Sequence, residues 1–268
     1  MSRLTSKFQA LKEAKRKALI PFITAGDPTP EFTVPAMHAM VKTGADIIEL
    51  GVPFSDPMAD GPVIQKASER ALAHKMNLRR VMAIVEEFRA DDRDTPVVLM
   101  GYLNPIEAMG YAAFAERAGK AGVDGVLTVD LPPEESSDLL PLLEAAGVDP
   151  IYLLAPNSTE ERIRRMGRLG RGYLYYVSLK GVTGASHLDL GSVERKLAEI
   201  RSLTDLPVGV GFGVKDAETA LAVGKLADGV VVGSALVSRI EASENDPGRA
   251  LDEIIGLLHS LRSALDSI

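Results

Sequence analysis

Apolar residues gather in eight short runs that recur along the whole chain. Most of these runs are continuously apolar rather than alternating with polar residues, as expected of parallel strands that are covered on both faces. They occupy residues 18–24, 47–51, 97–102, 125–129, 151–154, 173–177, 208–212 and 229–233. The pattern predicts eight parallel β-strands.

Helical patterns fill the segments between these runs. Thr29 followed by Pro30 is typical of a helix start, with proline at the first helical position. Near the C-terminus one apolar stripe has helical spacing and consists of Ile254, Leu258, Leu261 and Leu265. The same spacing near the N-terminus predicts an extra helix covering the bottom of a core, with an apolar face of Leu4, Phe8 and Leu11.

The order of these elements predicts the fold class, α/β. Eight strand–helix units in 268 residues, with no linker or change of composition, predict a single domain over residues 1–268 that forms a (β/α)8 TIM barrel. The segment 51–96 holds two helical patterns, so we expect inserted helices in the loop after strand two, and an extra helix after strand eight. A doubly wound open sheet is the alternative, but it would usually have fewer strands and a glycine-rich fingerprint after the first.

Composition narrows the classes of function. The net charge of −7 argues against a default binder of nucleic acid or anionic membranes, and 46% hydrophobic residues exclude a largely disordered chain. The absence of cysteine removes disulfides, thiolate metal sites and cysteine nucleophiles. The first 17 residues are basic without the apolar core of a secretory signal, so we expect a cytoplasmic protein; an amphipathic transit peptide is the alternative.

A carboxylate lies inside the second apolar run. Glu49 stands near the carboxyl end of that predicted strand, where lost hydration should raise its pKa toward neutrality and suit it to acid–base catalysis. A buried ion pair with a lysine or arginine of the next strand is the structural alternative. Asp56 and Asp60 follow in a loop rich in Pro and Gly, where aspartate also commonly forms turns.

Two glycine clusters follow predicted strands seven and eight. They read Gly-Val-Gly-Phe-Gly over 209–213 and Gly-Ser-Ala over 233–235. In TIM barrels these two loops often bind phosphate, because glycine lets main-chain N–H groups approach the anion and a helix dipole favours its charge. Ordinary tight turns are the alternative. The loop 178–187 after strand six has the composition of a mobile lid, and its Lys180 is a candidate for Schiff-base chemistry.

Other catalytic classes have little support in the sequence. The four histidines are scattered without metal-ligand spacing, so we expect no metal site. The chain also contains neither the G-x-S-x-G motif of serine hydrolases nor the G-x-x-x-x-G-K-[ST] motif of nucleotide-binding loops.

Taken together, these motifs resemble the tryptophan synthase alpha chain family. The resemblance rests on ELGVPFSDPMADGPVIQ at 49–65, SLKGVTG at 178–184, and the GFG and GSA turns at 211–213 and 233–235. It implies a lyase of tryptophan (aromatic amino-acid) biosynthesis that cleaves indole-3-glycerol phosphate by a retro-aldol reaction to indole and glyceraldehyde 3-phosphate. It also implies an alpha2-beta2 heterotetramer with a beta chain that carries pyridoxal phosphate, and no cofactor on this chain.

The resemblance also assigns roles to residues. Glu49 would be the catalytic acid and base, and Asp60 the carboxylate that orients the indole ring. The phosphate would be bound by Gly184, Gly213, Gly233 and Ser234. Seven further residues would line the substrate pocket or steer the catalytic groups: Phe22, Leu99, Tyr102, Leu127, Tyr175, Thr183 and Phe212. The chain departs from enteric members at Leu179-Lys180, where they have Arg-Ala, and at Met58, where they have leucine.

Loops at the predicted active-site face carry many apolar and proline residues. We expect this face to bind the beta chain as well, through Pro53, Asp56, Met58, Asn104 and Pro105. Alternatively, these side chains fold back onto the barrel's own helices.

Two other functions remain open at this point. A Schiff-base phosphosugar aldolase would use Lys180, and borohydride would then trap the substrate on the protein. A non-catalytic barrel would bind a phosphorylated ligand and regulate a partner, but the presence of both Glu49 and Asp60 argues against it. An assay for indole release separates it from the lyase.

Overall fold

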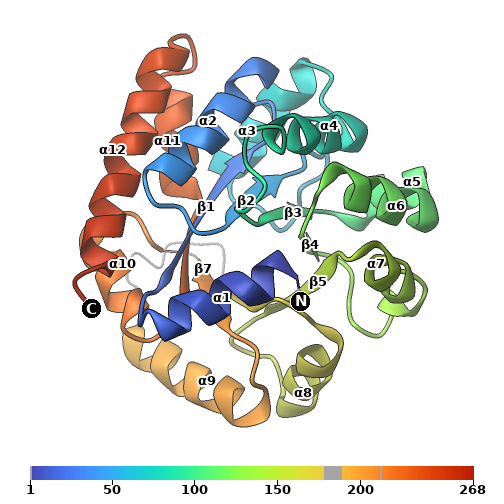
Figure 1. Cartoon of the computed structure of the whole chain (residues 1–268), viewed down its shortest axis with the longest axis vertical. Helices are drawn as coiled ribbons and strands as arrows, with labels where there is room; N and C mark the ends of the chain where they lie inside the picture. Colours follow the sequence, from blue (N-terminus) through green and yellow to red (C-terminus); the bar gives the residue numbers. More distant parts are fainter. Residues whose placement is uncertain (1, 178–188, 212) are drawn as a thin grey trace.

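The computed structural model describes residues 2–177, 189–211 and 213–268 and contains a closed barrel of parallel strands in the order β1 to β8 (Figure 1). The strands are β1 (Ala18–Thr24), β2 (Ile48–Gly51), β3 (Val97–Gly101), β4 (Gly125–Thr128), β5 (Asp149–Leu154), β6 (Leu174–Val177), β7 (Val208–Gly211) and β8 (Gly229–Val232). All eight predicted strands are present, with ends within two residues of the prediction, and the TIM barrel is confirmed.

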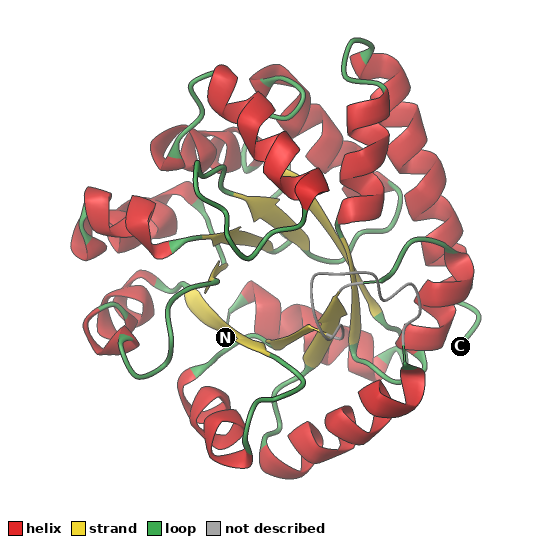
Figure 2. Ribbon diagram, turned by 180° about the vertical axis from the view of Figure 1, so that it is seen from behind, coloured by secondary structure: helices red, strands yellow, loops and turns green. Residues whose placement is uncertain are grey.

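Helices surround the barrel and close one end of it (Figure 2). They are α1 (Arg3–Glu13), α2 (Pro30–Lys42), α3 (Pro62–Ala73), α4 (Leu78–Phe88), α5 (Leu103–Met109), α6 (Tyr111–Ala121), the 3-10 turn η1 (Ser136–Asp138), α7 (Leu140–Ala146), α8 (Glu160–Leu169), α9 (Leu190–Leu203), α10 (Ala217–Gly224), α11 (Ser234–Ala242) and α12 (Pro247–Leu265). The inserted helices after β2 and β8 are confirmed; a further short helix after β3, α5, was not predicted. Within the described ranges no helix is long and apolar enough to cross a membrane.

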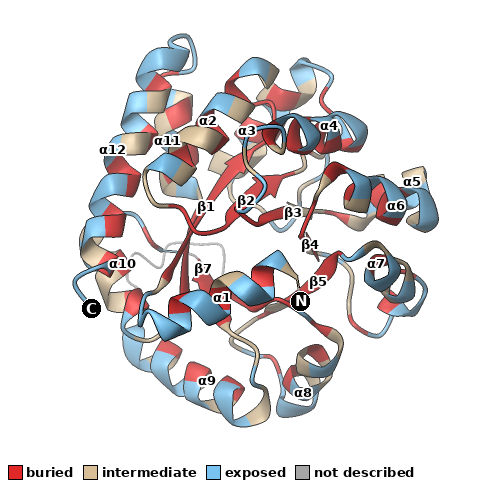
Figure 3. Ribbon diagram, in the orientation of Figure 1, coloured by how far each residue is buried: buried red, intermediate tan, exposed pale blue. Residues whose placement is uncertain are grey.

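The side chains of the strands belong to two apolar layers, one on each side of the barrel wall. Residues that point outward pack beneath the helices, and residues that point inward fill the barrel with Ile20, Val98, Leu127, Ile151 and Tyr173. Because both faces of each strand are buried, the strands are continuously apolar. In Figure 3 the strands are coloured mostly as buried, and the helices around them carry the exposed residues.

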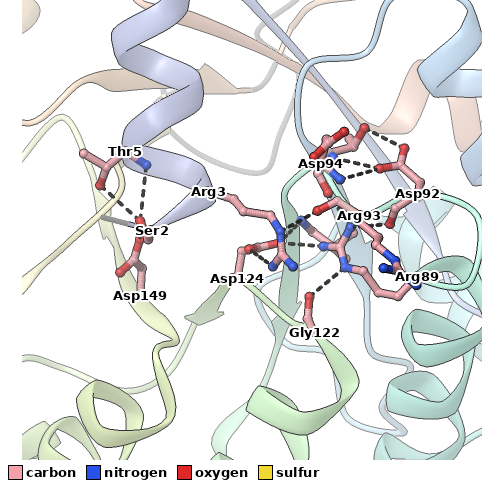
Figure 4. A network of polar contacts seen from close by, with 12 residues as sticks. Ser2, Arg3, Thr5, Arg89, Asp92, Arg93, Asp94, Gly122, Asp124 and Asp149 are labelled. Carbon is pink, nitrogen blue, oxygen red and sulfur yellow. Dashed lines mark hydrogen bonds and ion pairs between the residues drawn. The ribbon is translucent and has the colours of Figure 1, made fainter.

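The predicted N-terminal helix covers the amino end of the barrel. Its residues Leu4, Phe8 and Leu11 are buried among the inward-pointing side chains. A polar network fixes the start of this helix (Figure 4): Arg3 donates to Asp124 at 2.8 Å, and Asp124 also accepts from Arg89 at 2.6 Å. Helix α1 therefore leaves the opposite, carboxyl end of the barrel uncovered and available for a functional site.

Candidate active site

A cavity of about 260 Å³ opens at the carboxyl end of the barrel. It brings together Glu49, Asp60 and one or more residues of each glycine turn that the sequence singled out, whereas Asp56 lies outside it. Its lining consists of Phe22, Glu49, Asp60, Gly61, Pro62, Val63, Ile64, Met100, Tyr175, Gly213, Val214, Val231, Gly233 and Ser234. The inserted helix α3 supplies an apolar wall, Val63 and Ile64, that the sequence reasoning missed although its amphipathic pattern lay next to Asp60.

Glu49 reaches the cavity from β2 and is completely buried. Tyr173 donates a hydrogen bond of 2.5 Å to Glu49 Oε1, and Oε2 has no hydrogen-bond partner among the described residues. Burial raises the pKa of Glu49 from 4.5 to about 8, and the bond from Tyr173 opposes this rise. Within the described part of the chain no lysine or arginine pairs with this carboxylate, so the structural alternative of an ion pair is wrong.

Glycines of β7 make room for Tyr175 of β6 and for Tyr173, the residue just before β6. A Cβ atom on Gly211 would lie 1.9 Å from the Tyr175 hydroxyl oxygen, and one on Gly209 would lie 3.3 Å from the Tyr173 ring. These two glycines therefore serve the barrel interior, which lets Tyr173 extend toward Glu49. Only the last glycine of this cluster, Gly213, lies on the cavity.

Asp60 is positioned by Tyr102. The Tyr102 hydroxyl donates to Asp60 Oδ2 at 3.1 Å and accepts from the Ala59 N–H at 3.0 Å. The Phe54 ring stacks on the Tyr102 ring, with 5.2 Å between centroids. Burial raises the pKa of Asp60, and the hydrogen bond from Tyr102 opposes the change. Tyr102 thus lies outside the cavity lining and contacts the Asp60 carboxylate, which fits the second of the two roles expected of it, steering a catalytic group.

The far side of the cavity is built from main chain. Gly213 has φ +84°, a conformation that other residues adopt at a cost. Gly233 precedes α11 and Ser234 begins it; no described side chain caps this helix. The first N–H groups of a helix lack acceptors inside the helix, so they are available to an anion in the cavity.

Two predicted pocket residues lie elsewhere. Leu99 points outward into the layer beneath the helices, because side chains alternate along a strand, and its neighbour Met100 lines the cavity instead. Leu127 points into the barrel but is fully buried outside the cavity lining. Phe22 and Tyr175 do line the cavity. The remaining predictions in the loop after β6 and after β7 lie outside the described residues: Lys180, Thr183, Gly184 and Phe212.

The predicted docking residues divide into exposed and buried ones. Met58 is 86% exposed, a large value for an apolar side chain, and Asp56 and Asn104 are exposed as well. Pro105 is half-buried. Pro53 is buried, and its contact with a beta chain stays a prediction.

Comparison with known proteins gives a consistent result. The family model of the tryptophan synthase alpha chain matches residues 8–265. The chain is 69% identical over 267 residues to the tryptophan synthase alpha chain of Methylococcus capsulatus and 62% identical over 266 residues to that of Thioalkalivibrio sulfidiphilus, with 99–100% of each chain covered.

Solved structures extend the likeness to the fold. Tryptophan synthase subunit alpha from Legionella pneumophila is 45% identical and superimposes with a TM-score of 0.93 over all of both chains. An aminoacrylate-bound tryptophan synthase from M. tuberculosis is 35% identical, with a TM-score of 0.88 over 99% of this chain and 100% of that chain. The chain belongs to the tryptophan synthase alpha chain family.

Proposed function

We propose that this chain is the lyase subunit of tryptophan synthase, which cleaves indole-3-glycerol phosphate to indole and glyceraldehyde 3-phosphate in tryptophan biosynthesis. Family membership supports the reaction. The observation that carries the assignment of roles is a fully buried Glu49 that has no ion-pair partner among the described residues. It shares one cavity with Asp60 and with the turns at Gly213 and Gly233.

Glu49 is the acid and base of this proposal. Indole leaves only after carbon 3 of its ring is protonated, and a carboxyl with a pKa of about 8 is mostly protonated at neutral pH and able to donate that proton. Glu49 then takes the proton of the side-chain hydroxyl next to the breaking bond. The carbonyl of glyceraldehyde 3-phosphate forms, the carbon–carbon bond breaks, and its electron pair returns to the ring.

Asp60 stabilises the charge on the ring in the same proposal. Protonation of carbon 3 places positive charge on the ring nitrogen, and a carboxylate that accepts the ring N–H offsets it. The Tyr102 hydroxyl occupies Oδ2 of Asp60 and leaves Oδ1 for the ring. Its role in this scheme is to position Asp60.

The phosphate of the substrate belongs at the other side of the cavity. Gly213 and the start of α11 at Gly233 and Ser234 offer main-chain N–H groups and the positive end of a helix dipole. Glycerol phosphate should therefore compete with the substrate.

An assay of indole release by the purified chain tests this function. Glu49→Gln should lower the rate by at least about 10²-fold, as general acid–base groups contribute about 10²–10⁴-fold, with little change in affinity for glycerol phosphate. Glu87→Gln, at an exposed helix position, is the matched control and should keep full activity. Retention of more than about a tenth of the rate by Glu49→Gln would contradict the role. Trapping of the substrate by borohydride would favour Schiff-base chemistry at Lys180 instead.

We further propose that the catalytic face binds a beta chain, which carries pyridoxal phosphate, in an alpha2-beta2 heterotetramer. The exposed Met58 stands on the loop that also holds Asp60, and this loop is bonded to Tyr102, two residues before the exposed Asn104. Met58→Asp should weaken the complex, whereas Ile268→Asp, another exposed apolar position, should not. Equal affinity of both variants for the beta chain would place the interface elsewhere. A cytoplasmic location stays a prediction.

A further inference from the structure

A second cavity, of about 430 Å³, lies at the amino end of the barrel, opposite the catalytic one. Its walls come from the end of α1, the segment that leads into β1, the end of α9 and the loop between α9 and β7. The end of α1 approaches α9 at the lower left of Figure 1. Buried side chains of Phe8 and Leu11 form part of the lining. The volume is within the range of small-molecule sites.

The lining of this cavity is strongly basic. It holds five cationic side chains, Lys12, Lys15, Arg16, Lys17 and Arg201, against the two carboxylates of Asp205 and Asp228. This local excess of positive charge occurs in a chain whose net charge is −7. The electrostatic potential at this cavity is therefore opposite in sign to that expected from the net charge of the chain, and the cavity attracts anions.

Two of the five cations have no side-chain partner in the described part of the chain. Arg16, Lys17 and Arg201 each donate to a carboxylate or main-chain oxygen at 2.7–3.4 Å. Lys12 and Lys15 have no side-chain hydrogen bond or ion pair with any described residue, and both are exposed. Two ammonium groups at the same cavity are thus available to a ligand.

The end of α1 does not need these two lysines as caps. The carbonyl oxygens of its last turn accept main-chain N–H groups, including Arg16 N to Leu11 O at 2.8 Å and Lys15 N to Lys12 O at 3.1 Å. Lys15 itself has φ +55°, at a position where helices usually place glycine or asparagine. Because main-chain groups cap this turn, the ammonium groups of Lys12 and Lys15 stay available to a ligand in the cavity.

We propose that this basic pocket is a second anion site that binds a diphosphate or triphosphate group. One multiply charged anion neutralises several neighbouring cations at once, which a single carboxylate does not, and lysine is a common phosphate ligand as a mobile point charge. The group can come from inorganic pyrophosphate or from a nucleoside polyphosphate such as ATP. The site is separate from the turns at Gly213 and Gly233, which face the other end of the barrel.

Calorimetric titration of the full chain with pyrophosphate, and separately with ATP, tests the site. We expect saturable binding that weakens as salt is raised. Lys12→Gln/Lys15→Gln should weaken it about tenfold or more, because hydrogen bonds to charged groups are the strong ones. Equal affinities for both probes would indicate a site for the phosphates alone, and tighter binding of ATP a site that also contacts the nucleoside; either outcome supports the proposal.

The matched control is Lys42→Gln/Lys75→Gln. Lys42 stands in the last turn of α2 as Lys12 does in α1, Lys75 has φ +58°, and both are exposed. The two double variants change the net charge equally, so a general field effect would weaken binding in both. Equal weakening, or no saturable binding to the unmodified chain, would overturn the proposal. So would amide chemical shifts that change on titration only around residues 213 and 233–235 and not at 12–17 and 201–207.

Discussion

Glu49→Gln removes a side chain whose ionisation opposes folding. Burial raises the pKa of Glu49 from 4.5 to about 8 in the folded chain, while the unfolded chain keeps the ordinary value. Between these two values the folded chain holds more protons than the unfolded one, so the free energy of unfolding falls as the pH rises. The loss begins near pH 4.5 and is complete above about pH 8.

The size of the effect follows from the two pKa values. Each unit of difference corresponds to about 1.4 kcal/mol, so ionisation of Glu49 costs the fold about 3 kcal/mol at pH 7. Glutamine does not titrate, and its amide oxygen still accepts the bond from Tyr173. Relative to the unmodified chain, the variant should therefore gain about 1 kcal/mol at pH 5 and about 4 kcal/mol at pH 8.

Urea unfolding followed by circular dichroism from pH 5 to pH 8 measures this gain. Glu87→Gln, which removes an exposed carboxylate, should show no such trend. The pH dependence of the difference is decisive, because any fixed packing effect of the amide is the same at every pH. A difference between Glu49→Gln and the unmodified chain that stays constant from pH 5 to pH 8 would refute the reasoning.

Three further changes have defined outcomes. Tyr173→Phe removes the hydrogen bond that lowers the pKa of Glu49, so the profile of kcat against pH should move to higher pH; an unchanged profile would exclude this coupling. Gly233→Val should raise KM for the substrate about tenfold or more with a smaller change in kcat, because its side chain would enter the proposed phosphate site; an unchanged KM in steady-state assays would count against that site. Asp124→Ala leaves two arginines without their carboxylate and should lower the free energy of unfolding by about 3 kcal/mol in urea titrations, whereas a loss below about 1 kcal/mol would show that the network is dispensable.

The strands were predictable because each one is buried on both faces. That burial makes each strand a continuous apolar run, and it made Glu49 visible as the single carboxylate inside such a run. Because both faces of each strand are apolar, the sequence does not show which side chains point into the barrel and which point toward the helices. Leu99 and Met100 are both apolar, so the sequence carries no signal of which one points into the cavity; only the pairing of β3 with its neighbours decides it.

Contacts between residues that are distant in the sequence could not be predicted either. Tyr173 and Glu49 are separated by 124 residues and meet only because the barrel closes. The glycines at 209 and 211 suggested a phosphate turn, but the absence of a Cβ atom there makes room for the side chains of Tyr173 and Tyr175. The sequence gives no indication that Tyr102 bonds to Asp60. The two residues are 42 positions apart, and only the folded loop brings the hydroxyl to the carboxylate.

The amino end of the barrel determines what its carboxyl end presents. Asp46, just before β2, accepts the main-chain N–H of Leu19 on β1 at 2.9 Å, and three residues further along both strands Phe22 stands opposite Glu49. Asp124 and Asp228 accept from the first residues of β3 and β7 in the same way, at 2.8 and 2.9 Å. Because a slip of one residue would turn Glu49 outward into the helix layer, these bonds fix the register on which the site depends. Residues at the opposite end of the barrel thus determine that Glu49, the proposed acid and base, faces the cavity.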